Sequence, residues 1–550
     1  MKKYFFMFKE LLTNHKRMLI LIWIAAFFSI AAGGILYMLL PILLKYLPLR
    51  SFDALVYYRS QLQFLSRVAV YLGIIALICG GISYKTRPSL KLLSLGALLA
   101  GAALRLDCYF SRELWNDTLS LAVWLKELSF AEILSGKGAN PYCQSAPPVF
   151  ALLSKQIGDL AGYRSLYLNA MPLLFSLGGL WCFRTLAGKL LTPTGAAAAL
   201  WLFALNPGTY FYAGEFKQYS GDIFFTIVIL NMTVDYVRNS EKFPWSLSVT
   251  GIIGTLFSHA MFFILPAVGL AMLLNCRKFP FSHLAGTAAL WLPVVLLLAL
   301  WTKAAMPGDM YVHEHHITGF APLPTSAEKL NWYWKTALDL FIAPWGLSWK
   351  FAILSLFPLV GMCNGIRLFF HEDKVFINAF LFTMSLLLAA SILHQYSMAA
   401  GAPFAKSRLI LFTIPFAPIC FVKGVETGKW RYLLLPAAVC SLLNITTSFM
   451  PLADIVPAVR ALEKYHTPGS TVYVNSVAAE CAVKLYSKSP EKFKKLIRIP
   501  FNRIPDEAEG FVVVADVPLK YITVGKNTEL LSCRSFALSS LMVVEKKKSH

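Results

Sequence analysis

The sequence is poor in charge, and poorest in negative charge. Charged residues fill only 15% of its 550 positions, 29 Asp and Glu stand against 51 Lys and Arg, and 57% of the residues are hydrophobic. A soluble protein of this length could not bury so many apolar side chains, so an ordinary soluble protein is excluded. Several apolar runs reach the roughly 18 residues needed to cross a membrane. We therefore predict a polytopic α-helical membrane protein in which membrane lipids surround the chain.

The sequence also shows neither a cleavable signal peptide nor a nucleic-acid-binding module. The first apolar run, 18–44, is too long for the core of a cleaved signal peptide, and no clear small-residue cleavage site follows it. We expect this run to be the first membrane span. The net charge of +22 is not accompanied by a module of basic and aromatic residues, so we predict no nucleic-acid partner. Most Lys and Arg lie in short loops, where they orient membrane spans.

Basic loops alternate along the chain and predict about thirteen spans, with the N-terminus in the cytoplasm and the C-terminus outside. The predicted spans lie near 18–44, 66–84, 90–106, 165–187, 193–212, 219–237, two short helices within 246–275, 284–302, 349–369, 375–394, 408–424 and 431–449. Nearly all polar groups that could perform chemistry then lie on the outer side.

The composition changes near residue 453 and predicts two domains. Residues 1–452 form the membrane domain, and 453–550 form a small extracytoplasmic α/β domain. In the second domain, Thr471–Asn475 and Phe511–Ala515 are short β-branched runs, and Ile455–Lys464 has a helical pattern. We expect Leu541–Glu545 to be a last strand.

The first outer loop contains two amphipathic stretches, Thr118–Leu128 and Pro148–Leu160. Such helices either lie in the membrane interface or pack on the helical bundle, and the pattern leaves both open. Two outward cysteine pairs, Cys108 with Cys143 and Cys481 with Cys533, would suit disulfides in an oxidising compartment. An even count alone does not decide whether these bonds form.

Polar groups gather first at the end of the third predicted span. Glu113 and Asp117 are four residues apart, so they share a face if this stretch is helical. Asp117 could act as a base or as the N-cap of the following helix. Arg105 and Asp107 precede them as candidate supporting residues.

A denser group opens the sixth predicted span. Glu215, Lys217, Tyr219 and Asp222 fall within about two helical turns of an otherwise apolar helix. Ionisable residues at that depth are costly and usually face a cavity or a partner. The alternative is an internal ion pair of Lys217 with Glu215 or Asp222 that only fixes helix packing.

Two outer loops carry further candidates. The run Asp309–His316 contains His313, His315 and His316, which could ligate a divalent metal, although its spacing matches no recognised zinc signature. No other cofactor is indicated. The loop from Gln395 ends in Arg408, which suits a phosphate but could equally snorkel at the interface.

Carboxylates and cations on one outer face fit transfer of a group from a lipid-linked phosphate donor. The motifs resemble the GT-C superfamily of membrane glycosyltransferases, and its branch of protein O-mannosyltransferases and lipid A aminoarabinose transferases. The resemblance rests on four blocks: Leu114-Trp-Asn-Asp117-Thr118, Gln144-Ser-Ala-Pro147-Pro148, Glu215-Phe-Lys217-Gln-Tyr219-Ser-Gly-Asp222 and Pro403-Phe-Ala-Lys-Ser-Arg408.

By that resemblance the reaction is inverting, and a polyprenyl-phosphate sugar is the donor. Asp117 is the base, Lys217 and Arg408 hold the donor phosphate, and the remaining members of the third block, Glu215, Tyr219 and Asp222, shape the sugar pocket. Thr118 replaces the usual Glu, and Gln144 stands near a position where some relatives carry a contacting Glu-Lys pair. The resemblance also implies that the protein lies in a bacterial plasma membrane.

The acceptor, whether glycan, lipid or protein, is not indicated. Two other functions stay open. A transporter of a lipid-linked saccharide would also need outer cations and intramembrane acids, but no inverted repeat is present. A non-catalytic envelope-assembly subunit would explain the replacement by Thr118.

Overall fold

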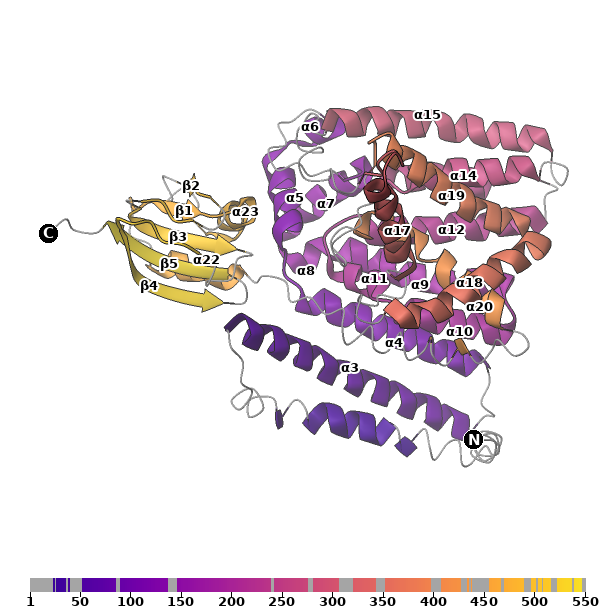
Figure 1. The fold of residues 1–550 in the computed structure, drawn as a ribbon, viewed down its shortest axis with the longest axis horizontal. Helices are drawn as coiled ribbons and strands as arrows, with labels where there is room; N and C mark the ends of the chain where they lie inside the picture. The colour runs from indigo at the N-terminus through magenta and orange to yellow at the C-terminus, as the bar shows by residue number, and fades with distance from the viewer. Residues whose placement is uncertain are drawn as a thin grey trace.

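The computed structural model describes most of the chain (Figure 1). Apart from a few single residues or pairs, the described residues are 23–39, 52–85, 90–136, 146–238, 242–275, 280–305, 320–342, 352–396, 407–426, 433–437, 455–465, 469–488, 496–515 and 522–546. They form a body of helices with a smaller sheet-containing unit at one end.

The helical body is built from long apolar helices and short connecting ones. Its elements are α3 (Phe52–Lys85), α4 (Leu90–Ser111), α5 (Asn116–Glu127), α6 (Phe130–Ser135), α7 (Pro148–Ala161), α8 (Ser165–Leu168), α9 (Ala170–Leu190), α10 (Pro193–Ala204), α11 (Pro207–Tyr210), η1 (Phe211–Gly214), α12 (Tyr219–Arg238), α13 (Trp245–Phe257), α14 (Met261–Leu274), α15 (Phe281–Ala305), α17 (Ala327–Ile342), α18 (Ala352–Glu372), α19 (Lys374–Ile392), η6 (Ser407–Thr413) and α20 (Phe416–Val425).

Six helical segments among the described residues are long and apolar enough to cross a membrane. They are Gln61–Cys79, Leu90–Ser111, Ser165–Leu190, Tyr219–Arg238, Phe281–Ala305 and Lys374–Ile392. Each overlaps a predicted span, which confirms the mostly helical, membrane-type fold. The total of thirteen and the orientation stay predictions, because most of the last predicted span and much of the first lie outside the described residues.

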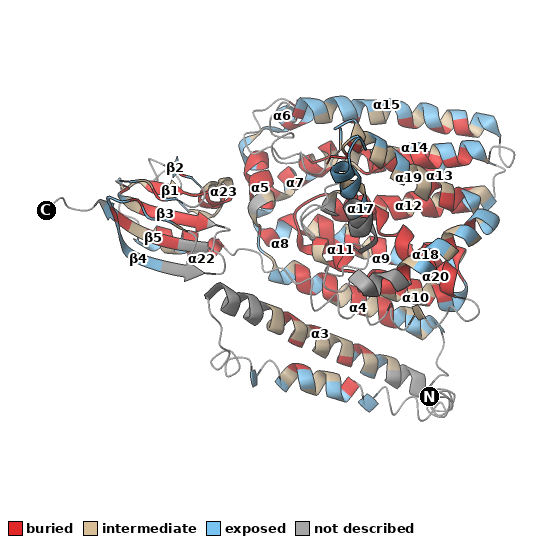
Figure 2. Ribbon diagram, in the orientation of Figure 1, coloured by how far each residue is buried: buried red, intermediate tan, exposed pale blue. Residues whose placement is uncertain are grey.

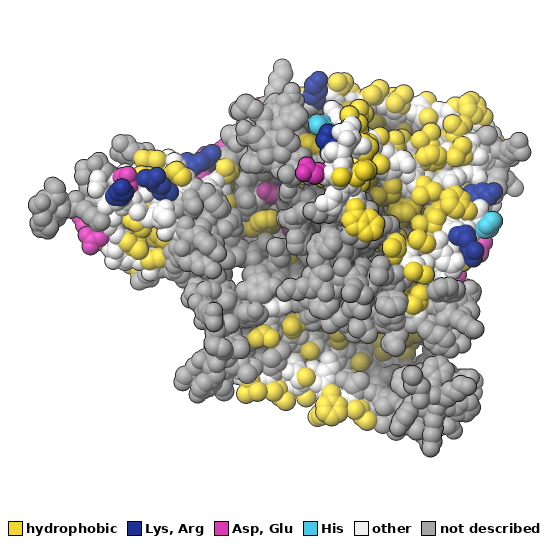
Figure 3. All heavy atoms as spheres, viewed as in Figure 1, with side chains coloured by type: hydrophobic (Ala, Val, Ile, Leu, Met, Phe, Trp, Pro, Cys, Tyr) yellow, Lys and Arg dark blue, Asp and Glu magenta, His cyan; other side chains and the backbone are white. Residues whose placement is uncertain are grey.

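The outer surface of this body is apolar where a membrane protein meets lipid. On α15, Leu292, Leu297 and Leu300 are each 59% or more exposed. Figure 2 shows α15 exposed along its outer edge, whereas α12 is buried along nearly its whole length. Figure 3 shows hydrophobic side chains spread over the body in the same region, with Lys and Arg toward its ends. An apolar face of this extent is unusual for a soluble monomer.

The predicted span 193–212 is wrong at its second half. α10 ends at Ala204, and Asn206 then accepts a hydrogen bond from the Gly208 backbone N–H at 2.8 Å. Pro207 opens the short helix α11, because its missing N–H costs nothing at a first helical position. The chain therefore turns through α11 and η1, and this buried turn leads into the segment from Glu215 to Asp222.

The smaller unit contains a five-stranded sheet with the order β2-β1-β3-β5-β4. Strand β1 is parallel to β2 and β3, whereas β5 is antiparallel to β3 and β4. Its elements are α22 (Val456–Tyr465), β1 (Val472–Val474), α23 (Val477–Tyr486), β2 (Leu496–Arg498), β3 (Gly510–Ala515), β4 (Thr528–Phe536) and β5 (Ser539–Lys546). The β-branched runs predicted as strands are β1 and β3. The domain boundary at residue 453 stays a prediction.

The structure bears on the two disulfides considered above for the outward cysteine pairs. Cys481 is a free, buried thiol on α23, whereas Cys533 is exposed on β4. Cys108 is also free and buried in α4, whereas Cys143 lies outside the described residues. The disulfide between Cys481 and Cys533 is therefore contradicted.

Candidate active site

Asp117 lies in the first turn of α5, the helix that follows a short non-helical stretch after α4. The Thr118 hydroxyl accepts from the Trp115 N–H and donates to the Trp115 carbonyl, both at 2.7 Å. Trp115, not Asp117, is the N-cap, so the alternative that Asp117 caps this helix is wrong. The partial positive charge at the N-terminus of a helix stabilises a carboxylate in the first turn, such as that of Asp117. Thr118 supplies the local bond that closes the turn, which gives the unexpected Thr a structural role.

Glu113 and Asp117 do not share a helix face. Residues 112–115 belong to no helix, because α4 ends at Ser111 and α5 begins at Asn116. The Glu113 carboxylate accepts a hydrogen bond from the Ser165 hydroxyl at 2.6 Å, at the start of α8. The expectation of paired carboxylates fails because the local sequence changes direction between two helices.

The segment from Glu215 to Lys217 is buried although it carries both signs of charge. Glu215 is 2% exposed and Lys217 is 4% exposed. Between them, the ring of Phe216 stacks on Phe150 of α7, with the ring centroids 5.9 Å apart. Phe150, Phe216 and the α5 residue Leu119 belong to one buried apolar cluster. The two predicted parts of the site, the base and the cation, are therefore anchored in the same core.

Arg112 is a candidate site residue that sequence reasoning missed. Its guanidinium stacks on the ring of Phe211, and Nη1 lies 3.9 Å from the Glu215 carboxylate, too far for a hydrogen bond. Burial lowers the pKa of Arg112 against the opposing effect of nearby groups, including Glu215. An arginine between the predicted span 90–106 and Asp117 was the signal that could have identified it.

Asp222 lies in the first turn of α12 and fixes the turn between α13 and α14. Its Oδ1 accepts from the Ser258 hydroxyl at 2.6 Å, and the Ala260 N–H lies 3.5 Å away. The same turn contains His259, the second residue that sequence reasoning missed. Burial, with a smaller contribution from Lys217, lowers the pKa of His259 to about 4, so the ring is neutral at neutral pH. The sequence feature that could have identified His259 is an ionisable residue between two apolar helices.

Several buried polar atoms at this end of the body have no hydrogen-bond partner within the described structure. They are Arg112 Nη1, Trp115 Nε1, both amide atoms of Asn169, Gln218 Oε1 and His259 Nε2. Each such atom costs roughly 1–3 kcal/mol of stability. Native proteins rarely keep them unless a ligand or water satisfies them. Both donors and acceptors are represented, which suits a ligand rich in hydroxyl groups.

The other predicted binding residues flank this region. Tyr219 is the first residue of α12 and packs edge-on against Tyr212, with ring centroids 5.2 Å apart. The backbone of Arg408 lies in η6, which packs against α12, but its side chain is outside the described atoms. Tyr396, four residues after the end of α19, donates to the Leu409 carbonyl at 2.7 Å and so holds η6 in place.

The two candidate supporting residues on α4 anchor helices. The Arg105 guanidinium is fully buried and donates to the Ser176 hydroxyl at 2.8 Å and to the Ala204 carbonyl, at the end of α10, at 3.3 Å. Asp107 accepts from Arg67 at 2.6 Å and from Tyr71 at 3.0 Å, both on α3. Arg105 therefore supports the turn before Glu215, whereas Asp107 joins α4 to α3.

The remaining candidates, Gln144, His313, His315 and His316, lie outside the described residues. Among the residues that the structure does describe, no group of three or more His, Cys, Asp or Glu could hold a metal ion. The metal site therefore stays a prediction for the loop 306–319.

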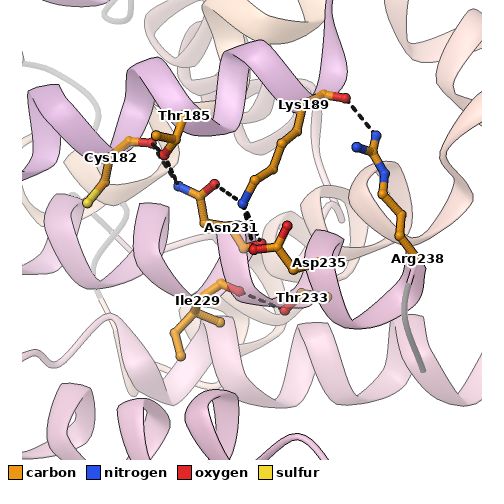
Figure 4. Close-up of polar contacts among 8 residues, drawn as sticks. All are labelled: Cys182, Thr185, Lys189, Ile229, Asn231, Thr233, Asp235 and Arg238. Carbon is orange, nitrogen blue, oxygen red and sulfur yellow. Dashed lines mark hydrogen bonds and ion pairs between the residues drawn. The ribbon is translucent and has the colours of Figure 1, made fainter. Parts of the chain in front are cut away.

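The opposite end of α12 carries a second polar group, shown in Figure 4. Lys189 of α9 donates to Asp235 at 2.7 Å and to the Asn231 side chain at 2.9 Å. The Asn231 amide donates in turn to the Cys182 carbonyl at 2.7 Å, and Arg238 donates to the Lys189 carbonyl at 2.6 Å. This network joins α9 to α12.

No family model matches the chain, and no curated protein matches it. Among solved structures, ArnT from Cupriavidus metallidurans bound to undecaprenyl phosphate is similar over 82% of this chain and 97% of its own, with a TM-score of 0.48 and 10% identity. The Archaeoglobus fulgidus oligosaccharyltransferase in complex with Zn and sulfate is similar over 76% of this chain and 68% of its own, with a TM-score of 0.45 and 13% identity.

The archaeal oligosaccharyltransferase AglB, in complex with an inhibitory peptide and a dolichol-phosphate, is similar over 77% of this chain and 69% of its own. Its TM-score is 0.41, with 12% identity. ArnT and AglB are both GT-C glycosyltransferases, the superfamily that the sequence motifs resemble. Because these TM-scores lie below 0.5, the likeness by itself assigns this chain neither a family nor an activity.

Proposed function

We propose that the protein is an inverting glycosyltransferase that uses a polyprenyl-phosphate sugar on the outer face of a bacterial plasma membrane. The observation that carries this proposal is the shared core of α5 and the Glu215–Asp222 segment. It anchors a helix-start carboxylate, Asp117, and a buried cation, Lys217, in one region. A base and an anion-binding group are the two elements that such a transfer needs.

The proposed reaction is a single displacement. Asp117 accepts the proton of an acceptor hydroxyl, and the resulting oxygen nucleophile attacks the anomeric carbon of the donor sugar. The bond between that carbon and the phosphate oxygen breaks, and its electron pair leaves with the polyprenyl phosphate. Lys217, with Arg112 and Arg408, stabilises the charge that develops on this leaving group.

The buried polar atoms support a sugar as the transferred group. A sugar hydroxyl both donates and accepts hydrogen bonds, so it can satisfy Trp115 Nε1, Gln218 Oε1 and His259 Nε2 alike. A neutral His259 adds no further positive charge beside Lys217, so the ring can bind a neutral hydroxyl.

The test is reconstitution of purified protein in liposomes with polyprenyl-phosphate hexoses or pentoses labelled in the sugar. Incubation with cell-envelope extract as acceptor should transfer label and release polyprenyl phosphate. Movement of the labelled lipid across the bilayer without transfer would instead establish a transporter. Neither transfer nor movement, with the donor still bound, would favour an assembly subunit.

A further inference from the structure

Helix α5 is buried on every side. Each residue from Thr118 to Leu125 is at most 3% exposed, although α5 is a short helix that connects two loops. A helix that is buried all round needs a partner on each face. Figure 1 shows these partners: α7 lies on one side of α5, and the sheet-containing unit lies on the other, with α23 at the edge that faces α5.

On the first side, α7 and the residues after it hold the end of α5. The carbonyl of Leu125, in the last turn of α5, accepts from Lys155 Nζ at 3.2 Å and from the Tyr163 hydroxyl at 3.4 Å. Lys155 is itself buried and pairs with Asp159 at 3.1 Å. Cations and donors at a helix end satisfy carbonyls that the helix leaves unpaired.

On the second side, α23 packs directly on α5. Cys481 Sγ lies 3.9 Å from Ser120 Oγ, across 361 positions of sequence, and Lys484 Nζ lies 3.5 Å from the Glu127 carboxylate. The buried side chains that α23 contributes to this core are mostly small: Ala478, Ala479, Cys481, Ala482 and Val483. Small side chains let two helices approach closely, so this contact tolerates little added volume.

The contact lies next to Asp117. Ser120 is three positions after Asp117, so the two are neighbours on the surface of α5. The α5 residues Leu121 and Leu125 share one apolar cluster with Val459 of α22 and with Val483 of α23. Removal of a covering partner would expose these apolar side chains, which is unfavourable.

We propose that α23 positions α5, and that Cys481 is a positioning residue which sets the location of Asp117 through Ser120. The C-terminal domain is then part of the transferase mechanism without touching the substrate. This inference rests on the proposed function only in taking Asp117 as the base.

Size, not reactivity, is the property of Cys481 that matters. Burial raises the pKa of its thiol to about 12, so the thiol is protonated at neutral pH and is a poor nucleophile. We therefore expect Cys481→Ala to retain turnover, whereas Cys481→Phe forces the helices apart. A displacement near 1 Å at a catalytic group can cost about 100-fold in rate.

The first experiment measures kcat and the donor KM in proteoliposomes for Cys481→Phe, Cys481→Ala and Leu531→Trp, the last an exposed position on β4 that serves as control. Cys481→Phe should lower kcat at least about tenfold with the donor KM within about twofold, because only the base moves. The other two variants should match the wild type. A Cys481→Phe protein that is folded and turns over normally would overturn the proposal.

A second experiment decides the matter should Cys481→Phe fail to fold. Ser120→Cys places a second sulfur opposite Cys481, and mild oxidation should yield a linked peptide by mass spectrometry. Turnover of the linked protein should stay within about twofold of its reduced form, since the link holds α5 where α23 already holds it. A reversible loss of turnover, or no linked peptide, would overturn the proposal. Because the peptide readout needs no substrate, it separates this inference from failure of the proposed function.

Discussion

The two ends of the helix pair α9 and α12 use polar residues in opposite ways. At the Arg238 end, Lys189, Asn231 and Asp235 satisfy one another by hydrogen bonds, and the side chain of Asp235 is 57% exposed. About 30 Å away along α12, at the Tyr219 end, the polar groups are buried and several atoms lack partners. The first arrangement stabilises helix packing, whereas the second leaves hydrogen-bond donors and acceptors available to a ligand. Matched substitutions at the two ends can separate these roles.

The largest effect is expected for Asp117→Asn, which removes the proposed base. Transfer of labelled sugar should fall by about 10²–10⁴-fold, the usual contribution of a general base. Asp235→Asn, a matched change at the other end of the pair, should leave turnover within about twofold. Equal transfer by Asp117→Asn and wild-type membranes would remove Asp117 from the mechanism.

Next in size is the loss of a phosphate-binding cation. Lys217→Ala should weaken binding of the lipid donor by about 10–100-fold, equivalent to about 1.4–2.8 kcal/mol. Lys189→Ala, which disrupts the network of Figure 4, should leave donor affinity unchanged and lower thermal stability. Donor titration of both variants measures the contrast, and equal affinities would show that Lys217 does not hold the donor.

A third pair tests whether the unpartnered atoms cost stability. Both side-chain atoms of Asn169 are buried without a partner, so Asn169→Leu should stabilise the protein by about 1–3 kcal/mol while it lowers turnover. Asn231→Leu breaks the hydrogen bonds of Asn231 with Lys189 and with the Cys182 carbonyl and should destabilise the protein. Thermal unfolding in detergent measures both. Destabilisation by Asn169→Leu would indicate that Asn169 is structural.

The smallest expected effect concerns acid stability. The pKa of His259 is lowered to about 4, so between about pH 6.5 and pH 4 the unfolded state binds the proton and the folded state does not. Stability is therefore lost as the pH falls through this window, and His259→Gln should lose less than the wild type. His283→Gln, which removes a partner of Tyr236 at the other end, keeps His259 and should lose as much as the wild type. Identical pH profiles for all three proteins would exclude a buried neutral His259.

Long apolar runs made much of the helical body predictable. The predicted spans 90–106, 219–237 and 375–394 correspond to α4, α12 and α19, because a membrane-length apolar run has few alternatives to a helix. The predicted span 193–212 failed where an Asn-Pro step ended α10. Local turn chemistry of this kind outweighs hydropathy over the last few residues.

The candidate site was predictable only in part. Motif positions predicted Asp117 and the Glu215–Asp222 segment as site residues, because both place ionisable groups at the ends of apolar helices. Arg112, Asn169 and His259 were missed, since their significance depends on burial and on bonds they lack. The contact of Ser120 with Cys481 spans 361 positions and could not be read from a local pattern.

The most direct test of the account is the stereochemistry and stoichiometry of one reconstituted turnover. Purified protein, a polyprenyl-phosphate sugar of known anomeric configuration and a competent acceptor fraction should give a glycosidic product of inverted configuration. One polyprenyl phosphate should be released for each sugar transferred. A product of retained configuration, or lipid movement with no release of polyprenyl phosphate, would contradict a direct displacement at the Tyr219 end of α12.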